Sequence, residues 1–279
     1  MTYLSCWLKW LALGSLVAIA PTSLALAKPA LSPSVSHVAQ TSQANFSQHF
    51  QDLDIEGSII IYDLNQELTY QHNPERNATP FLPASTFKIL NSLIALETGV
   101  IANDLSILTW DGVNRSIPAW NRDHNMRTAF PASTVWFYQV LARRIGYERM
   151  QQWVAAADYG NQNIGSNDAI DTFWLNGDLR ITPQEQIQFL QRLESNDLPF
   201  SDDTIATVKD IMIVERTPDY TIRAKTGWAL VGEVGWYVGY VEQNENVYFF
   251  ATNIHIRDQT DLKHRAEVTR RSLETLQLL

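Results

Sequence analysis

The segment Pro83-Ala84-Ser85-Thr86-Phe87-Lys88 contains the only Ser-x-x-Lys pattern in the chain. An apolar pattern with helical spacing begins there, so the serine hydroxyl and the lysine amine would lie one turn apart on one face. A serine becomes an effective nucleophile when an adjacent base takes its proton. The start of a helix also offers unpaired N–H groups that would stabilise a negatively charged oxygen. Because this pattern occurs about once by chance in a chain of this length, a helix start with a solvated lysine is the alternative that other residues must outweigh.

The tripeptide Lys225-Thr226-Gly227 occurs once and stands at the end of a predicted strand. It places an ammonium group and a hydroxyl on a rigid edge, where they would hold a carboxylate of a substrate. The glycine would let that strand approach a ligand closely. A strand that simply ends in a turn explains the same residues equally well.

Two further motifs are ordinary when each is taken alone. Ser133-Thr134-Val135 stands where a helix is predicted to begin, and a serine there is typical of a helix N-cap. Tyr159-Gly160-Asn161 follows a predicted helix and is typical of a helix C-terminal turn. A third stretch, Phe173-Trp174-Leu175, would by itself indicate core packing.

Taken in their order along the chain, from the Ser85 segment to Lys225-Thr226-Gly227, the five motifs resemble those of the class D serine β-lactamases. The pair Ser-x-x-Lys and Lys-Thr-Gly also typifies the wider group of β-lactamases and penicillin-binding proteins. The resemblance runs from about Gly57 to the C-terminus and includes Trp110-Asp111-Gly112, Leu141-Ala142-Arg143-Arg144-Ile145-Gly146 and Gly235-Trp236-Tyr237-Val238-Gly239. Class A enzymes carry Ser-Asp-Asn, where this chain has Ser166-Asn167-Asp168 in a predicted loop. The six histidines show no metal-ligand spacing, which argues against a metallo-β-lactamase.

The resemblance implies hydrolysis of the β-lactam ring of penicillin-type antibiotics through an acyl-enzyme on Ser85. Lys88 would carry CO2, taken from bicarbonate, as a carbamate and act as general base in acylation and deacylation. Only a neutral amine adds CO2, so this role requires an apolar pocket around the lysine. Ser133 matches the residue that passes a proton to the lactam nitrogen. No metal and no other cofactor is implied.

The resemblance also implies how the rest of the site is divided. The backbone N–H groups of Ser85 and Trp228 would form an oxyanion hole. The other matches are the substrate-binding residues Lys225, Thr226, Gly227 and Arg265, the carbamate-pocket residues Val135, Trp174 and Leu175, and the residues at the site edge, Tyr159 and Asn161.

Some assignments keep alternatives. Arg265 suits a bidentate contact with the substrate carboxylate, but Arg257 and Lys263 lie close to it in the sequence. Trp136 stands where many class D enzymes have a smaller residue or proline, and Tyr138 would lie near the lysine pocket, so either would change pocket width or carbamate stability. Substrate preference within the β-lactams is not encoded in a motif.

Two other functions share these motifs. A penicillin-binding cell-wall peptidase or transpeptidase would acylate but turn over β-lactams slowly. A penicillin-binding sensor domain would bind β-lactam covalently and signal, but such domains are tethered to membrane-spanning segments. The stretches around Ser133 and Trp174 favour the lactamase.

Composition and charge limit the class of protein. The 279 residues are 45% hydrophobic with a formal net charge of −9, which disfavours nucleic acid or an anionic membrane as a partner. Residues 1–27 read as a signal peptide, with Lys9, an apolar stretch over residues 10–20 and the small-x-small site Ala25-Leu26-Ala27. Cleavage there would remove the only cysteine and leave no membrane span; a retained N-terminal anchor is the alternative. The sequence carries no signal for an oligomeric state.

The elements that would position these motifs follow from periodicity. Strands are predicted at both ends of the mature chain and helices between them, so one antiparallel sheet would be assembled from the two ends. We therefore expect an α/β (α+β) fold of the serine β-lactamase and penicillin-binding transpeptidase type, with flanking helices and a helical subdomain. The predicted organisation is a linker or N-terminal arm over residues 28–48 and a single catalytic domain over 49–279, with sheet parts at about 49–80 and 215–279 and a helical part at about 81–214.

Overall fold

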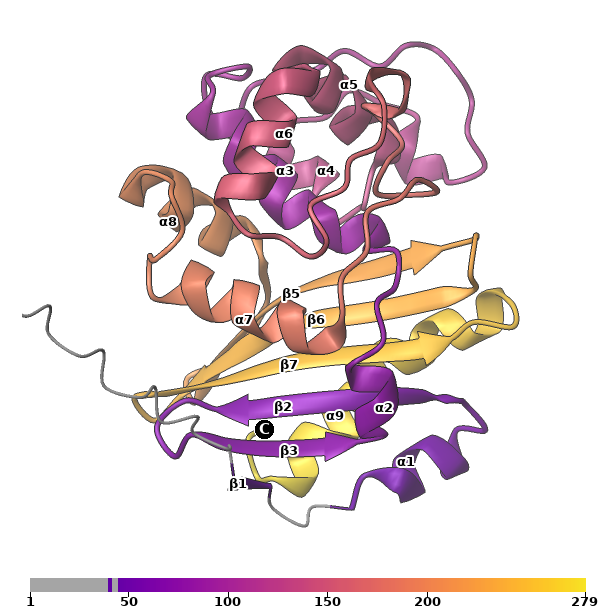
Figure 1. The fold of residues 1–279 in the computed structure, drawn as a ribbon, viewed down its shortest axis with the longest axis vertical. Coiled ribbons are helices and arrows are strands. Elements are labelled where there is room, and N and C mark those ends of the chain that lie inside the picture. Colours follow the sequence, from indigo (N-terminus) through magenta and orange to yellow (C-terminus); the bar gives the residue numbers. More distant parts are fainter. Residues whose placement is uncertain (1–39, 42–44) are drawn as a thin grey trace, which may run out of the picture. The chain divides into compact units, whose positions relative to one another are not determined.

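The computed structural model describes residues 40–41 and 45–279. Residues 1–27, where the signal peptide is predicted, lie outside the described residues, as does most of the predicted linker. The described part contains a seven-stranded sheet of order β1-β3-β2-β7-β6-β5-β4 (Figure 1). The strands are β1 (Gln40–Thr41), β2 (Gly57–Asp63), β3 (Leu68–His72), β4 (Ile213–Arg216), β5 (Tyr220–Ala229), β6 (Val234–Gln243) and β7 (Asn246–His255).

The sheet joins the two ends of the described chain, which confirms the predicted fold class. Strand β2 pairs antiparallel with β7, from Gly57 opposite Ile254 to Asp63 opposite Tyr248. All pairs are antiparallel except the two-residue β1, which runs parallel to β3 at the edge. β6 and β7 form a hairpin whose loop residues Asn244 and Glu245 both have positive φ, the geometry that matches the twist of the strands.

Helices cover both faces of this sheet. The α-helices are α1 (Ser47–Asp52), α2 (Pro74–Asn77), α3 (Lys88–Glu97), α4 (Met126–Ala129), α5 (Val135–Ile145), α6 (Tyr147–Ala156), α7 (Pro183–Glu194), α8 (Asp202–Ile211) and α9 (His264–Thr275). The 3-10 helices are η1 (Ala84–Phe87), η2 (Pro118–Trp120), η3 (Asn167–Ala169) and η4 (Gln259–Lys263). One apolar core joins α3 to α8 with one face of the sheet, and a second joins α1 and α9 with the other face. In Figure 1, α3 to α6 gather beyond the β5 edge of the sheet.

Local signals set several helix boundaries. Helix α7 begins with a capping box: Thr182 accepts a hydrogen bond from the Glu185 backbone, and Glu185 accepts one from Thr182 in return. Helix α5 ends at Ile145, with Gly146 as its C-cap. The predicted helix from Ala84 differs, because its first turn is the 3-10 helix η1 and α-helical geometry begins only at Lys88.

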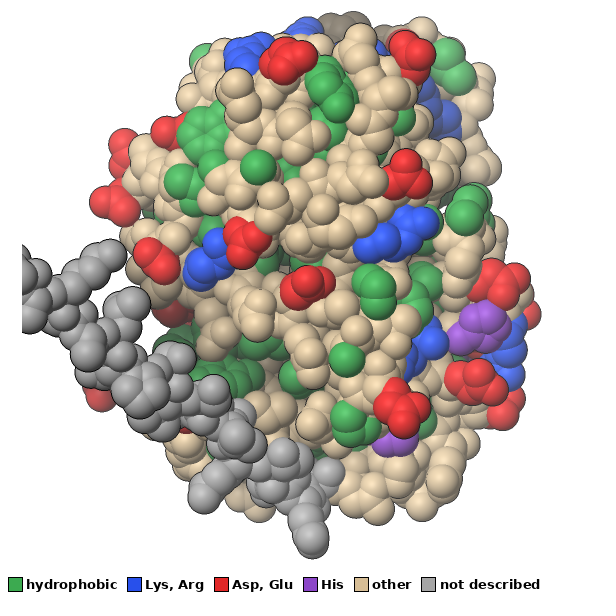
Figure 2. Space-filling view, in the orientation of Figure 1, with side chains coloured by type: hydrophobic (Ala, Val, Ile, Leu, Met, Phe, Trp, Pro, Cys, Tyr) green, Lys and Arg blue, Asp and Glu red, His purple; other side chains and the backbone are tan. Residues whose placement is uncertain are grey.

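The surface agrees with an acidic chain. On the face in Figure 2, lysine and arginine side chains lie scattered among acidic ones and form no continuous basic patch. Throughout residues 45–279, every helix is too short or too polar to cross a membrane.

Candidate active site

Ser85 and Lys88 meet at the junction of η1 and α3. Lys88 Nζ lies 2.6 Å from Ser85 Oγ. In a 3-10 turn, residues three apart are eclipsed, which brings the two side chains closer than an α-helical turn would. The turn is held from both sides, because Thr86 Oγ1 donates to Pro83 O at 2.7 Å and Ala84 N donates to Trp174 O at 2.9 Å.

Lys88 is an amine without a counterion. It is 0% exposed, and no carboxylate of the described residues lies within 4.0 Å of its Nζ. Burial lowers the pKa of Lys88 well below its usual value, and the nearby charge of Lys225 lowers it further. Both effects disfavour the ammonium form, so the lysine is arranged to accept a proton from the serine that contacts it.

The walls beside this lysine are aromatic. Trp174 stacks on Phe87 with ring centroids 5.4 Å apart, and both residues are 0% exposed. The indole Nε1 of Trp174 is buried and has no hydrogen-bond partner among the described residues. The Tyr138 ring lies 5.4 Å from Lys88 Nζ, and its hydroxyl is engaged at 3.0 Å by Ser92. A buried unpaired N–H costs free energy, which makes Trp174 a donor available to an anionic group.

Tyr138 therefore lies beside the lysine, as predicted. Val135, the first residue of α5, is half-buried, and Leu175 packs against the same apolar core as Trp174. Trp136 is buried, and its Nε1 donates at 2.8 Å to Trp120 O.

Ser133 and Lys225 form the second polar pair. Lys225 Nζ donates to Ser133 Oγ at 3.0 Å and to Thr226 O at 3.0 Å. Burial, with a smaller effect of the Arg265 charge, lowers the pKa of Lys225 to about 7. Ser133 is not the N-cap of α5, which is Thr134; it is a turn residue with φ of 55°. The two residues are 92 positions apart in the sequence, and the sheet edge brings them together.

The edge of β5 exposes backbone donors next to η1. Strand β4 pairs with β5 only as far as Arg223, and Ala224 N donates to Met212 O on that side. Because backbone groups alternate along a strand, the N–H of Trp228 points to the same side as that of Ala224, away from β6. The donor predicted for the oxyanion hole thus faces the unpaired part of the edge.

Gly227 lies against the turn that carries Ser85. A Cβ on Gly227 would lie 3.1 Å from Thr86 Cγ2 and 3.2 Å from Pro83 O. The missing side chain therefore lets the Lys-Thr-Gly strand pack against the turn that carries Ser85.

Arg265 reaches this edge from α9 on the opposite face. Its Nη1 donates to Gly227 O at 2.6 Å, and burial lowers its pKa to about 10. Gly235 makes room for it, since a Cβ there would lie 2.9 Å from Arg265 Cδ. Of the two alternatives, Arg257 is held by Asp54 and Asp261, and Lys263 is exposed. Arg265 is the one of the three that contacts the Lys-Thr-Gly strand.

The two residues expected at the site edge make core and loop contacts. Tyr159 is 0% exposed and packs between Phe87 and Phe189, because it forms part of the core behind η1. Asn161 accepts from Arg180 N and donates to Asp178 O, so it ties two loop segments together.

Sequence reasoning missed the residues that brace the serine turn. Gln186 donates to Thr86 Oγ1 at 2.9 Å and to Tyr159 Oη at 3.4 Å, and it is fully buried. The sequence feature that could have identified Gln186 is its place beside Ile187 and Leu190 on the apolar face of α7. Trp120, whose indole contacts the residue before Ser133, carried no signal of its own.

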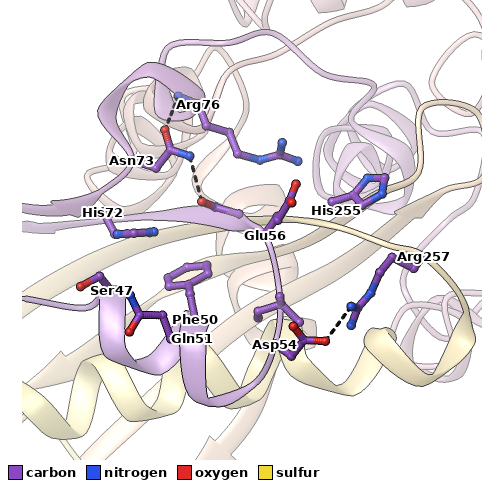
Figure 3. A pocket seen from close by; sticks show the side chains of 12 residues that line it. Ser47, Phe50, Gln51, Asp54, Glu56, His72, Asn73, Arg76, His255 and Arg257 are labelled. Atoms are coloured by element: carbon purple, nitrogen blue, oxygen red, sulfur yellow. Dashed lines mark hydrogen bonds and ion pairs between the residues drawn. The ribbon is translucent and has the colours of Figure 1, made fainter.

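A separate cavity of about 770 Å³ contains none of the predicted site residues (Figure 3). It lies at the start of β2 and is lined by α1, by Asn73 and Arg76 of the α2 region, and by His255 and Arg257 after β7. Arg257 pairs there with Asp54 at 2.9 Å, and Arg76 Nε donates to Asn253 Oδ1 at 2.8 Å. Elsewhere too, the described residues include no cluster of three His, Cys, Asp or Glu that would hold a metal ion.

Known proteins are similar to this chain in sequence and in fold. The penicillin binding protein transpeptidase domain family matches residues 57–274. β-Lactamase OXA-48 of Klebsiella pneumoniae is 42% identical over 241 residues, which are 85% of this chain and 90% of that protein. The probable β-lactamase YbxI of Bacillus subtilis (strain 168) is 39% identical over 214 residues, 76% of this chain and 79% of that one. The solved structure of the class D β-lactamase YbXI from Nostoc is 60% identical, with a TM-score of 0.83, and the match covers 84% of this chain and 99% of that chain.

Proposed function

The chain belongs to the class D serine β-lactamases, and on that premise we propose that it hydrolyses the β-lactam ring of penicillin-type antibiotics through an acyl-enzyme on Ser85. The observation that carries the assignment of roles is the 2.6 Å contact between Ser85 Oγ and the buried Nζ of Lys88, which has no carboxylate partner among the described residues. A serine nucleophile needs an adjacent base to take its proton, and a buried neutral amine in contact with the hydroxyl is such a base.

Acylation uses the residues around this contact. Ser85 Oγ bonds to the lactam carbonyl carbon as its proton leaves toward the Lys88 side chain. The backbone N–H groups of Ser85 and Trp228 stabilise the oxyanion. As the carbon–nitrogen bond breaks, Ser133 gives its hydroxyl proton to the nitrogen and takes a proton from the Lys225 ammonium, 3.0 Å away. The proton that Lys88 took from Ser85 balances this transfer. Water then adds to the acyl carbon and releases the ring-opened acid with Ser85 restored.

The surroundings of Lys88 fit the CO2-derived carbamate of this family. An amine kept neutral by burial adds CO2, and the unpaired Nε1 of Trp174 is a donor for the resulting anion. Val135 and Leu175 would keep bulk water from the group. When bound, the carbamate supplies a carboxylate base for the serine proton and for the deacylating water.

The substrate carboxylate would bind between Lys225, Thr226 and Arg265. The Arg265 guanidinium is anchored through Gly227 O and keeps further N–H groups for a bidentate contact. Tyr159 and Asn161 receive no catalytic role in this proposal, since each is engaged in core or loop contacts. We place the enzyme outside the cytoplasm, on the basis of the signal-like residues 1–27.

Steady-state hydrolysis of a penicillin by the purified protein, with and without added bicarbonate, tests the function. We expect sustained turnover that rises with bicarbonate. A burst that stops at one equivalent per protein, whatever the bicarbonate, would overturn the proposal. Such a burst is what a penicillin-binding sensor or a cell-wall transpeptidase would give.

A further inference from the structure

Ser133 is held in a backbone conformation that serine does not favour. Its φ is 55°, in the left-handed region, which is unfavourable for a residue with a side chain. Such a conformation persists only where its surroundings determine it. The direction of Ser133 Oγ toward Lys225 depends on this φ, so whatever fixes the backbone here also aims the hydroxyl.

Both peptide groups that flank Ser133 are fixed by hydrogen bonds. The group before it is held twice: Ser133 N donates to Phe130 O at 3.1 Å, and Ala132 O accepts from Trp120 Nε1 at 2.9 Å. These two atoms belong to one rigid plane, because the peptide bond does not rotate. The group after it is held where Thr134 N donates to Ala129 O at 2.9 Å. Only the Trp120 bond in this set comes from a side chain.

Trp120 is itself held by a second tryptophan. Trp136 Nε1 donates to Trp120 O at 2.8 Å, and Trp136 is 4% exposed. The Arg115 guanidinium lies 5.8 Å from the Trp136 ring centre, and the His124 ring lies 5.9 Å away. His124 Nε2 contacts Ala119 O at 2.9 Å, next to Trp120. The first turn of α5 thus holds η2, and η2 holds the peptide before Ser133.

We propose that Trp120, held in place by Trp136, is a positioning residue for Ser133: its indole N–H fixes the peptide that aims the Ser133 hydroxyl at Lys225. The proposal rests on the proton-donor role given to Ser133 above. Because Ser133 acts when the carbon–nitrogen bond breaks, loss of this hydrogen bond slows acylation and leaves deacylation unchanged.

The test is a double-mutant cycle on the acylation rate of the purified full chain with a penicillin, measured before steady state. Trp120→Phe keeps an aromatic ring and removes the donor. We expect it to slow acylation roughly tenfold or more, since small misplacements of catalytic groups have large effects. In a Ser133→Ala background, Trp120→Phe should slow acylation less than about twofold, because the group it positions is gone. Trp136→Phe should give the same pattern with a smaller loss.

Trp110→Phe is the matched control, since Trp110 Nε1 also donates to a backbone carbonyl, Val113 O at 3.0 Å, which is not part of either peptide group that flanks Ser133. It should change the acylation rate little. Equal losses from Trp120→Phe in the presence and absence of Ser133 would overturn the proposal and indicate a direct contact of Trp120 with substrate. An unchanged rate in Trp120→Phe would overturn it as well. If Ser133→Ala alone acylates normally, the proposed role of Ser133 fails, which is a separate result. Melting temperatures of all variants exclude a loss of folding as the cause.

Discussion

Two clusters of cations lie on this domain, and they differ in what surrounds them. Lys88, Lys225 and Arg265 gather around the Ser85 turn, and within the described chain none of them has a carboxylate within 4.0 Å. At the cavity at the start of β2 (Figure 3), Arg257 pairs with both Asp54 and Asp261, whereas Arg76 donates to Asn253 Oδ1 at 2.8 Å. Among these described cations, Arg257 is therefore the one that acids neutralise.

The difference shows in the pKa values. At the serine turn, burial and mutual repulsion lower the pKa of Lys88 and bring that of Lys225 to about 7. In the cavity, the hydrogen bonds of Asp261 and Asp54 raise the pKa of Arg257 above its usual value. Lys225, a buried cation without an acid, can exchange a proton near neutral pH, whereas Arg257 is held in its charged form and anchors the chain. The absence of a paired acid thus distinguishes the cations at the Ser85 turn from Arg257.

The largest effect is expected from Lys88→Arg. Arginine stays protonated and cannot serve as a base, so turnover of a penicillin should fall roughly a thousandfold or more. The converse change at the acid-paired cation, Arg257→Lys, should alter kcat/KM less than about twofold. Steady-state kinetics of both variants measure this. Turnover above a tenth of the unchanged enzyme in Lys88→Arg would show that the lysine is not the base.

Lys225→Met should change how stability depends on pH. The folded-state pKa of Lys225 is about 7, below its usual value of 10.5, so between these values the unfolded chain binds more protons. The free energy of unfolding therefore rises with pH in this window, and Lys225 contributes up to about 2 kcal/mol of that rise between pH 7 and 9. Lys225→Met should flatten the rise, whereas Arg257→Met should leave it unchanged. Urea unfolding at several pH values measures both, and equal slopes in all three proteins would contradict the assigned environment.

Arg265→Gln removes the cation proposed to hold the substrate carboxylate. We expect KM for a penicillin to rise roughly tenfold with a smaller change in kcat, because a charged hydrogen bond is lost from substrate binding. Arg270→Gln, on the same helix but paired with Glu215, is the control and should change neither constant. A rise in KM of the same size in both variants would point to a general effect on α9.

The smallest effect concerns pH and bicarbonate. As the pH falls toward the lowered pKa of Lys88, the amine becomes protonated and cannot add CO2. We expect activity to fall as the pH drops through this lowered pKa and bicarbonate to restore it severalfold, with a carbamate signal in 13C NMR after labelling with 13C-bicarbonate. The signal should persist in Ser85→Ala, which cannot turn over substrate, and disappear in Lys88→Arg. A signal that survives in Lys88→Arg would assign the carbamate to another residue.

Several elements were predictable because their signals are local. The β6–β7 hairpin has a short polar turn, and the start of α7 has a capping box within four residues. Other elements were missed because tertiary contacts decide them. Strand β4 carries an irregular pattern and is defined by its pairing with β5. Tyr159 was expected at the site edge on the basis of its motif, yet its ring packs into the core behind Phe87.

The contact of Ser85 with Lys88 follows from their spacing, because residues three apart in one helical turn lie on the same face. The order of the motifs along the chain likewise identifies the family. Folding of distant segments, by contrast, sets which cations remain without acids, which of three basic residues reaches the Lys-Thr-Gly strand, and how Ser133 is aimed. These depend on contacts across tens to hundreds of residues, where no sequence spacing sets the distance.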